Sequence, residues 1–386
     1  MRIGFDATVL SRATRYTGTG QYAEKLLQAM ARAAPDFQFL AYSYEGSPPG
    51  DDLWPANIAW RRLMPPPVGK LSAIAGHLWT LPRLVKKDNV QVLHVPTVHT
   101  RPSLPPVPSR LTCPIVVTVH DIIPITFYEK QPEGLPRRLR WFYRWNLRRA
   151  LRASRVITVS EHSRTEIVDC LRPAGDRISV IYNGVDSDFW SPGPVHGDLT
   201  PSEPYVLFAG SYEPRKNLHR LLLAFDSAVA GGLPHRLVMV VDAGSGHEPA
   251  LRAEAAKLAC NDRLQFLSGV PEEDLRELYR EADMLAFPSL SDGFGLPPVQ
   301  ALATGTPVLA SDIAVMREIL GGAADYCDPF SVPGIAAGII KLAGDPAHRE
   351  CLSRRGLTQA RIYTWERAAQ MTLDVYRGVI EETGRR

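Results

Sequence analysis

The stretch Pro288-Ser-Leu-Ser-Asp-Gly-Phe-Gly-Leu-Pro-Pro-Val-Gln-Ala-Leu-Ala-Thr-Gly-Thr-Pro-Val308 decides the fold of the second half of this chain. The apolar run at 284–287 leads into it and predicts a buried strand. Glycines then mark a turn, and the prolines at 297–298 suit the first turn of a helix, where amides have no intrahelical partner. Gly305 ends that helix, and Val308 begins another strand. The helix start presents free amides and a positive dipole end, which together favour phosphate binding.

The same stretch resembles the signature of the retaining family-four glycosyltransferases, which have the GT-B fold. The matching residues are Gly293-Phe-Gly-Leu-Pro297 and Gly305-Thr-Pro-Val308. Asp292 and Gln300 stand where the signature has two glutamates; Asp292 keeps the charge with a shorter reach, and Gln300 is neutral but can bond ribose hydroxyls. On this resemblance, the donor-binding residues of the stretch are Gly293, Phe294, Gly295, Leu296 and Gln300.

Composition indicates an ordinary globular protein. A chain of 386 residues has room for two or three domains, and 45% hydrophobic and 22% charged residues are typical of soluble proteins. The net charge of +3 is too small to indicate nucleic-acid binding, so no nucleic-acid partner is expected. Five scattered cysteines without a Cys-x-x-Cys pair predict reduced thiols in a cytoplasmic setting and no zinc site. No signal peptide and no membrane-spanning run is recognisable.

The first half of the chain alternates predicted strands with predicted helices. Strands are expected at 3–5, 37–41, 90–95, 115–119, 155–159 and 178–181. A helical segment at 71–86 is expected to be interrupted at Pro82. This alternation predicts a mainly parallel, doubly wound sheet, in which ligands lie beyond the carboxyl ends of the strands.

Two positions near those strand ends are candidates for ligand contact. The loop Thr17-Gly-Thr-Gly-Gln21 follows the first strand and leads into an amphipathic helix, so Gly18 and Gly20 are expected to let a donor approach the backbone. A plain strand-to-helix turn is the alternative. His120 directly follows the strand at 115–119, and a buried or capping histidine is the alternative to ligand contact there.

The resemblance extends to these positions. The context Thr-Val-His120-Asp-x-x-Pro is similar to the catalytic-edge segment of the family, which implies that His120 contacts the reacting sugar. Val-Ile-Thr-Val-Ser160 and Asn183-Gly-Val-Asp186 resemble the end of its N-terminal domain. Ser160 and Asn183 are therefore assigned to donor binding.

An arginine-rich stretch with interleaved aromatic residues occupies 135–155. As one helix it carries eight arginines together with Trp141, Phe142, Tyr143 and Trp145. One interpretation is a surface for anionic lipid headgroups or a polyprenyl-diphosphate-linked acceptor, which makes the protein peripheral on the inner face of the membrane. Nucleic acid also fits the composition. The alternative is a solvated helix whose aromatic residues pack on the core.

The domain pattern restarts after a segment rich in proline, glycine and serine. We predict an N-terminal Rossmann-like acceptor domain at 1–187, a linker at 188–204 and a C-terminal Rossmann-like donor domain at 205–364. The donor domain has strands at 205–209, 237–241, 264–267 and 284–287. The predicted fold class is α/β of the GT-B type, with the two domains facing across a cleft. The resemblance implies that the final helix, 365–386, crosses back to the first domain.

The loop after the first strand of the second domain gives a second match to the family. It contains Gly210 and the run Glu213-Pro-Arg-Lys-Asn217, in which Lys216 matches the lysine that pairs with the donor diphosphate. The family places an arginine at the position of Ser211, so Arg215 is expected to supply that charge. Cations at a helix start oppose the helix dipole, so a bound anion is expected there.

Together the matches imply a hexosyltransferase that retains anomeric configuration and needs neither metal nor other cofactor. The expected catalytic residues are His120, Arg215, Lys216 and Asp292, with Asp292 on a hydroxyl of the donor sugar. The similarity to the bacterial mannosyltransferase branch implies GDP-mannose as donor and a glycan or lipid-linked saccharide as acceptor, in the synthesis of cell-surface polysaccharide.

Two other functions stay open. The replacements at Asp292 and Gln300 are compatible with a non-catalytic GT-B protein that binds a sugar nucleotide or serves as a partner subunit. A sugar-nucleotide epimerase would change the sugar without any acceptor.

Overall fold

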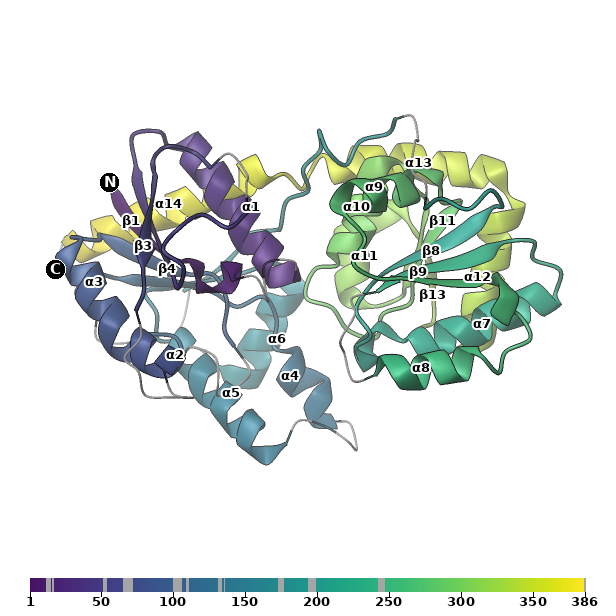
Figure 1. Cartoon of the computed structure of the whole chain (residues 1–386), viewed down its shortest axis with the longest axis horizontal. Coiled ribbons are helices and arrows are strands. Elements are labelled where there is room, and N and C mark those ends of the chain that lie inside the picture. The colour runs from purple at the N-terminus through teal and green to yellow at the C-terminus, as the bar shows by residue number, and fades with distance from the viewer. Residues whose placement is uncertain are drawn as a thin grey trace. The chain divides into compact units, whose positions relative to one another are not determined.

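The computed structural model describes residues 1–11, 15, 17–50, 54–64, 72–99, 106–108, 111–130, 134, 136–172, 177–193, 199–241 and 247–384. Parts of four predicted segments, namely Leu71, Leu135, 194–198 and 385–386, lie outside these residues. The chain divides into two compact units (Figure 1). The first unit is Met1–Gly184 with Trp365–Arg386, and the second is Val185–Thr364. Each contains one parallel sheet with helices, which confirms the predicted class of two α/β domains.

The first unit is built on a seven-stranded sheet with the order β3-β2-β1-β4-β5-β6-β7. Its strands are β1 (Arg2–Asp6), β2 (Gln38–Ser43), β3 (Ile58–Arg62), β4 (Val92–Val95), β5 (Ile115–Thr118), β6 (Arg155–Thr158) and β7 (Ile178–Val180). All neighbouring strands pair in parallel. β3 was not predicted from the sequence, because this edge strand is only half-buried and ends in two arginines.

Helices connect these strands. They are α1 (Gly18–Ala33), α2 (Ser72–Ala75), the π-helical η3 (Gly76–Thr80), α3 (Leu81–Lys87), α4 (Ile123–Thr126), α5 (Arg137–Ala150), α6 (Glu161–Leu171) and α14 (Trp365–Gly384), with short 3-10 turns η1 (Ala7–Leu10) and η4 (Tyr128–Lys130). The interruption predicted at Pro82 is a π-helical segment just before it. Pro82 itself lies in the first turn of α3, where a missing amide hydrogen costs no bond.

The second unit is built on a six-stranded parallel sheet with the order β10-β9-β8-β11-β12-β13. Its strands are β8 (Tyr205–Gly210), β9 (Arg236–Val241), β10 (Leu264–Leu267), β11 (Met284–Phe287), β12 (Val308–Ser311) and β13 (Asp325–Cys327). Its helices are α7 (Leu218–Ala230), α8 (Glu248–Ala255), α9 (Glu272–Glu281), α10 (Leu296–Thr304), α11 (Ala314–Leu320), α12 (Val332–Gly344) and α13 (Pro346–Ala360), with 3-10 turns η5 (Pro214–Lys216), η6 (Asn261–Arg263) and η7 (Gly321–Ala323). The three-residue β13 was not predicted.

The unit boundaries differ slightly from the predicted domains. The first unit ends at Gly184 rather than at residue 187, and the start of the predicted linker belongs to the second unit. Trp190 is buried there and lies edge-on against Tyr279, with ring centroids 5.5 Å apart. The linker prediction overlooked this aromatic anchor because proline and glycine dominate the surrounding composition. The last helix, α14, belongs to the first unit and packs beside α1 (Figure 1).

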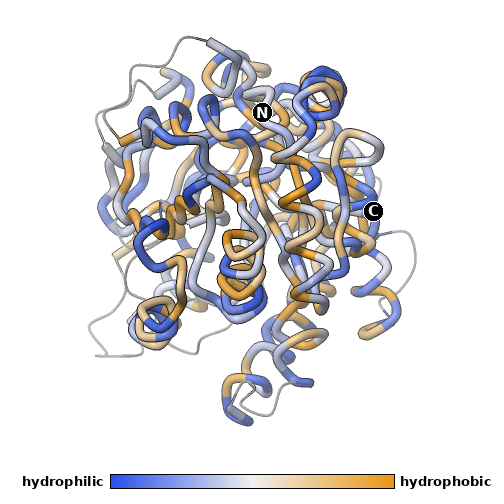
Figure 2. Tube along the Cα trace, turned by 90° about the vertical axis from the view of Figure 1, so that its right-hand side faces the viewer, coloured by the Kyte–Doolittle hydropathy of each residue, from blue (hydrophilic) through white to orange (hydrophobic). Residues whose placement is uncertain are grey.

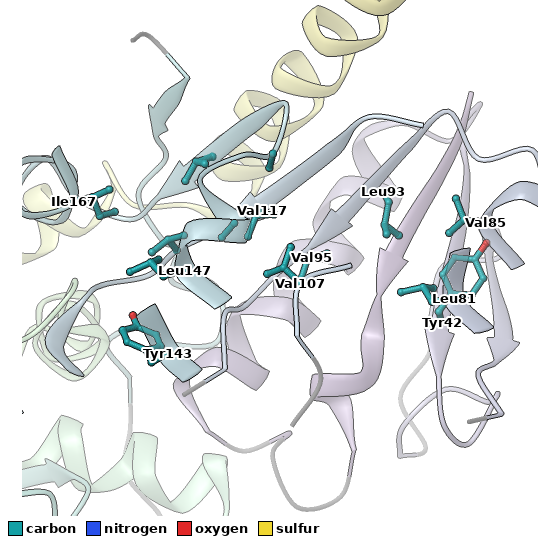
Figure 3. Packing of buried hydrophobic residues seen from close by; sticks show 14 of the residues in the cluster. Tyr42, Leu81, Val85, Leu93, Val95, Val107, Val117, Tyr143, Leu147 and Ile167 are labelled. Carbon is teal, nitrogen blue, oxygen red and sulfur yellow. The ribbon is translucent and has the colours of Figure 1, made fainter. Parts of the chain in front are cut away.

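Apolar side chains fill the space between sheet and helices in each unit. Figure 2 shows hydrophobic segments along the strands and alternating polar and apolar residues along the helices. Figure 3 shows part of one cluster in the first unit, which joins Leu93, Val95 and Val117 of the sheet to Leu81 and Leu147 of the helices. Among the described helices, none combines the length and apolarity that a membrane span requires.

Candidate active site

The glycine turn between β11 and α10 forms as the sequence predicts. Gly295 caps the helix with φ +88°, a left-handed conformation that side chains rarely adopt. A Cβ atom at this position would also lie 2.8 Å from Cε of Met316, so the end of that flexible side chain would have to shift. The prolines occupy the first turn, and Gly305 ends the helix after Thr304. The first amides of α10 thus face away from the helix body at the carboxyl edge of the sheet.

A buried ion-pair cluster lies next to this turn. Nζ of Lys216 donates to Oδ2 of Asp292 over 2.7 Å, and Nη1 of Arg215 donates to Oδ1 over 2.9 Å. Oγ of Ser289 donates to Oδ2 over 2.9 Å. Lys216 is only 5% exposed and Asp292 only 9%. Three predicted catalytic residues of the second unit are therefore in direct contact.

The anion expected beside the two cations is supplied by the protein itself. Asp292 bonds both of them, and Glu213 accepts a further bond from Nε of Arg215 over 2.7 Å. The four groups are formally neutral as a set. An incoming phosphate therefore has to compete with Asp292 for Lys216, which the sequence analysis did not foresee.

Burial and charge act in opposite directions on these groups. Desolvation, with help from the neighbouring Arg215, lowers the pKa of Lys216 to about 8, although Asp292 opposes this change. The pKa of Asp292 lies below its usual value because the charges of Lys216 and Arg215 outweigh the effect of burial. The amine of Lys216 also lies 4.6 Å from the ring centroid of Phe287. Lys216 is thus a partly desolvated cation close to a helix N-terminus.

Two residues outside the predicted set hold this loop together. Oγ of Ser289 lies 2.9 Å from Oδ2 of Asp292 and 3.1 Å from the carbonyl oxygen of Arg215, and its single proton is shared between these two acceptors. Asn217 adopts φ +60° and donates from Nδ2 to the carbonyls of Pro288 and Pro329. Both residues lie inside stretches quoted from the sequence, Asn217 in Glu213–Asn217 and Ser289 in Pro288–Val308, but neither was assigned a role.

The remaining predicted residues of the second unit surround the turn. Gly210 ends β8, Gly293 is buried, and Leu296 is half-buried at the start of α10. The side chain of Phe294 is only 3% exposed and packs edge-on against Tyr363, so only its backbone can meet a ligand. Gln300 is 9% exposed on α10.

His120 lies in the first unit, directly after β5. Its Nε2 is 2.9 Å from the carbonyl oxygen of Pro96, and because a carbonyl only accepts, Nε2 carries the proton. Burial lowers the pKa of His120 to about 4. The ring is therefore neutral at pH 7, and its Nδ1 is a hydrogen-bond acceptor suited to a hydroxyl group.

The other predicted residues of the first unit are placed differently from expectation. Gly18 and Gly20 lie in the first turn of α1 rather than in a loop, because Thr17 caps the helix by accepting from the amide of Gly20. Ser160 is fully buried and caps α6 by accepting from the amide of Ser163, so its hydroxyl has a structural role. Asn183 is 4% exposed, and within the part of the chain that the structure describes its Oδ1 meets no hydrogen-bond donor.

Among the described residues, no group of three or more histidine, cysteine, aspartate or glutamate side chains is arranged to hold a metal ion.

Two parallel α/β units, one of which has a basic loop beside the turn before a glycine-capped helix, are typical of the GT-B architecture. A family profile described as glycosyl transferases group 1 matches residues 197–359, and one described as Glycosyltransferase Family 4 matches residues 16–189. The chain belongs to this family of glycosyltransferases.

Individual relatives agree with this assignment. O-antigen chain mannosyltransferase B of Escherichia coli is 30% identical over 68% of this chain and 70% of its own length. O-antigen chain mannosyltransferase RfbU of Salmonella typhimurium is 31% identical, over 55% of this chain and 56% of its own length. The solved structure of sucrose-phosphate synthase from Thermosynechococcus elongatus superposes on 99% of this chain and on all of its own, with a TM-score of 0.79 at 18% identity, and supports the fold.

Proposed function

We propose that the protein transfers mannose from GDP-mannose, with retention of configuration, to a glycan or lipid-linked saccharide in the synthesis of cell-surface polysaccharide. The observation that carries the proposal is the buried Lys216, which together with Arg215 is bonded to Asp292 in the turn that precedes α10. The choice of mannose rests on the names of the two bacterial relatives.

In the proposed reaction the bond from C1 of the sugar to the diphosphate breaks, and both electrons leave with the phosphate. Lys216, Arg215 and the first amides of α10 stabilise the charge that develops there, without a metal or other cofactor. The acceptor oxygen bonds to C1 on the face that the phosphate leaves, and its proton passes to the departing phosphate.

Other residues fix the donor in this scheme. Asp292 contacts a hydroxyl of the sugar once the diphosphate has taken over Lys216, and Gln300 bonds the ribose. His120 accepts a hydrogen bond from the sugar at Nδ1, since its other ring nitrogen is committed to the carbonyl of Pro96.

A donor screen tests the proposal. GDP-mannose at a hundred times its dissociation constant is expected to raise the melting temperature by about 5 °C, more than UDP-, ADP- or TDP-sugars at the same concentration. GDP release in the presence of a lipid-linked saccharide should follow the same preference. Turnover with another donor alone would contradict GDP-mannose, and binding without turnover against a broad acceptor panel would favour the non-catalytic alternative.

We further propose that α5 binds the anionic face of the membrane that carries the acceptor. Trp141 is 68% exposed and stacks parallel to Trp145 at 6.3 Å. Arg137, Arg138 and Arg148 are exposed as well. At 100° per residue, Arg137, Trp141 and Arg148 fall on one face. An exposed tryptophan among arginines suits the boundary between headgroups and acyl chains.

Replacing Arg137, Arg138 and Arg148 with glutamine is expected to weaken binding to phosphatidylglycerol-containing vesicles about 100-fold, at roughly 1 kcal/mol for each arginine. Co-sedimentation measures this effect. A variant with the exposed Arg32, Arg354 and Arg361 changed to glutamine loses the same charge elsewhere and should bind as the parent protein does. Equal weakening in both variants, or equal binding to neutral vesicles, would contradict the assignment to α5.

A further inference from the structure

A chain of buried polar side chains runs through the first unit outside the groups described above. The hydroxyl of Tyr376, on α14, is 2.6 Å from Nδ1 of His94. Nε2 of His94 is 2.8 Å from Oγ1 of Thr118, which is 3.0 Å from the hydroxyl of Tyr22. These four side chains are at most 1% exposed. These hydrogen bonds join α14 to β4, β5 and α1.

Along this series of hydrogen bonds, each donor can be matched with an acceptor. Burial lowers the pKa of His94 to about 3, so its ring is neutral and has one donor and one acceptor nitrogen. The hydroxyls on either side can rotate to match whichever nitrogen they face. Because a buried polar atom without a partner costs free energy, each hydrogen bond in the chain restrains its neighbours.

Tyr22, at the end of this chain, also contacts His120. The two rings meet edge-to-face, with centroids 4.6 Å apart and planes at 87°. Tyr22 also contacts Trp365, the first residue of α14, and their ring centroids are 6.1 Å apart. His120 is therefore held by two groups, the carbonyl of Pro96 at Nε2 and the ring of Tyr22.

We propose that Tyr22 is a positioning residue for His120, and that α14 fixes Tyr22 in turn through Trp365 and the Tyr376–His94–Thr118 chain. The last helix of the sequence thereby sets the direction in which Nδ1 of His120 points. This inference rests on the proposed function only in assigning His120 to the donor sugar. The contact between the rings does not depend on that assignment.

The first test is nuclear magnetic resonance of the imidazole nitrogens, which reports the tautomer without any substrate. In the parent protein His120 is expected to be a single neutral tautomer with the proton on Nε2. Tyr22→Leu removes the ring and should give averaged tautomers, whereas Tyr22→Phe keeps the ring but loses the hydrogen bond to Thr118, so its signals should lie between those of the parent and those of Tyr22→Leu. Unchanged His120 signals in Tyr22→Leu would overturn the proposal.

The second test is a double-mutant cycle on turnover. Tyr22→Leu should lower kcat about tenfold or more with His120 present, since small displacements of a reacting group are costly, and should lower it no further in a His120→Ala background. Tyr42→Leu is the matched control, because Tyr42 is equally buried in the same unit and bonds Asp88 over 3.0 Å. It should lower the melting temperature but not kcat.

The two tests distinguish the positioning role of Tyr22 from the sugar-binding role of His120. Equal losses of kcat from Tyr22→Leu in both backgrounds would show a merely structural role and overturn the positioning proposal. Full turnover in His120→Ala would instead refute the role of His120 in the proposed function, and the tautomer measurement would still decide whether Tyr22 positions the ring.

Discussion

Lys216→Met is expected to lower sugar transfer about 100- to 1000-fold, the range found when one preorganised donor to a developing oxyanion is removed. Methionine keeps the apolar stem beside Phe287, so packing is largely preserved. The positive charge that Asp292 now holds at 2.7 Å, and that the diphosphate takes over in the proposed reaction, is lost. Initial rates of GDP release measure the effect.

The control is Lys341→Met. Lys341 also forms an ion pair, with Asp325 over 2.8 Å, but its side chain is 60% exposed. This variant should transfer sugar at the parent rate. Lys216 should also cause the rate to fall at alkaline pH, because only its protonated amine carries a charge. The value of kcat/KM should fall as the pH rises through about 8. The value of kcat should fall only at higher pH, because the bound donor anion favours the protonated amine. Lys216→Met retaining a third of the parent activity would refute the role assigned to Lys216.

Asp292→Asn is expected to lower the free energy of unfolding by about 3 kcal/mol, because it leaves two cations beside a neutral amide in a buried place. The melting temperature should fall by about 5–10 °C. Since the pKa of Asp292 in the folded protein lies below its usual value, this stabilisation is fully present at neutral pH and disappears only as the pH falls below about 4. Chemical denaturation at pH 7 measures the change.

Asp312→Asn is the matched control in the same unit. Asp312 pairs with Arg317 over 2.7 Å, but both side chains are about half exposed, and solvent screens such pairs. The melting temperature of the Asp312→Asn variant should stay close to that of the parent protein. If the two variants were equally stable, the cluster around Asp292 would not support the fold as described.

Short-range patterns located most of the second unit. Four features lie where the sequence predicts them, because each depends on neighbours within a few residues. They are the strand β11, the glycine turn, the prolines in the first turn of α10 and the end of that helix at Gly305. The edge strand β3 and the three-residue β13 escaped notice, since half-buried or very short strands have no strong pattern of their own. The interruption expected at Pro82 lies just before it, as the π-helical segment Gly76–Thr80.

By itself the sequence determined the fold class and the glycine-capped helix, because turn chemistry and apolar periodicity are local properties. Only the tertiary structure decided what those residues touch. Lys216 finds Asp292 at a separation of 76 residues, and His94 finds Tyr376 at a separation of 282. Such pairings follow from the order of strands in each sheet and from the packing of α14 against α1. They set the net charge of the cluster around Asp292 and, in our proposal, the direction in which Nδ1 of His120 points.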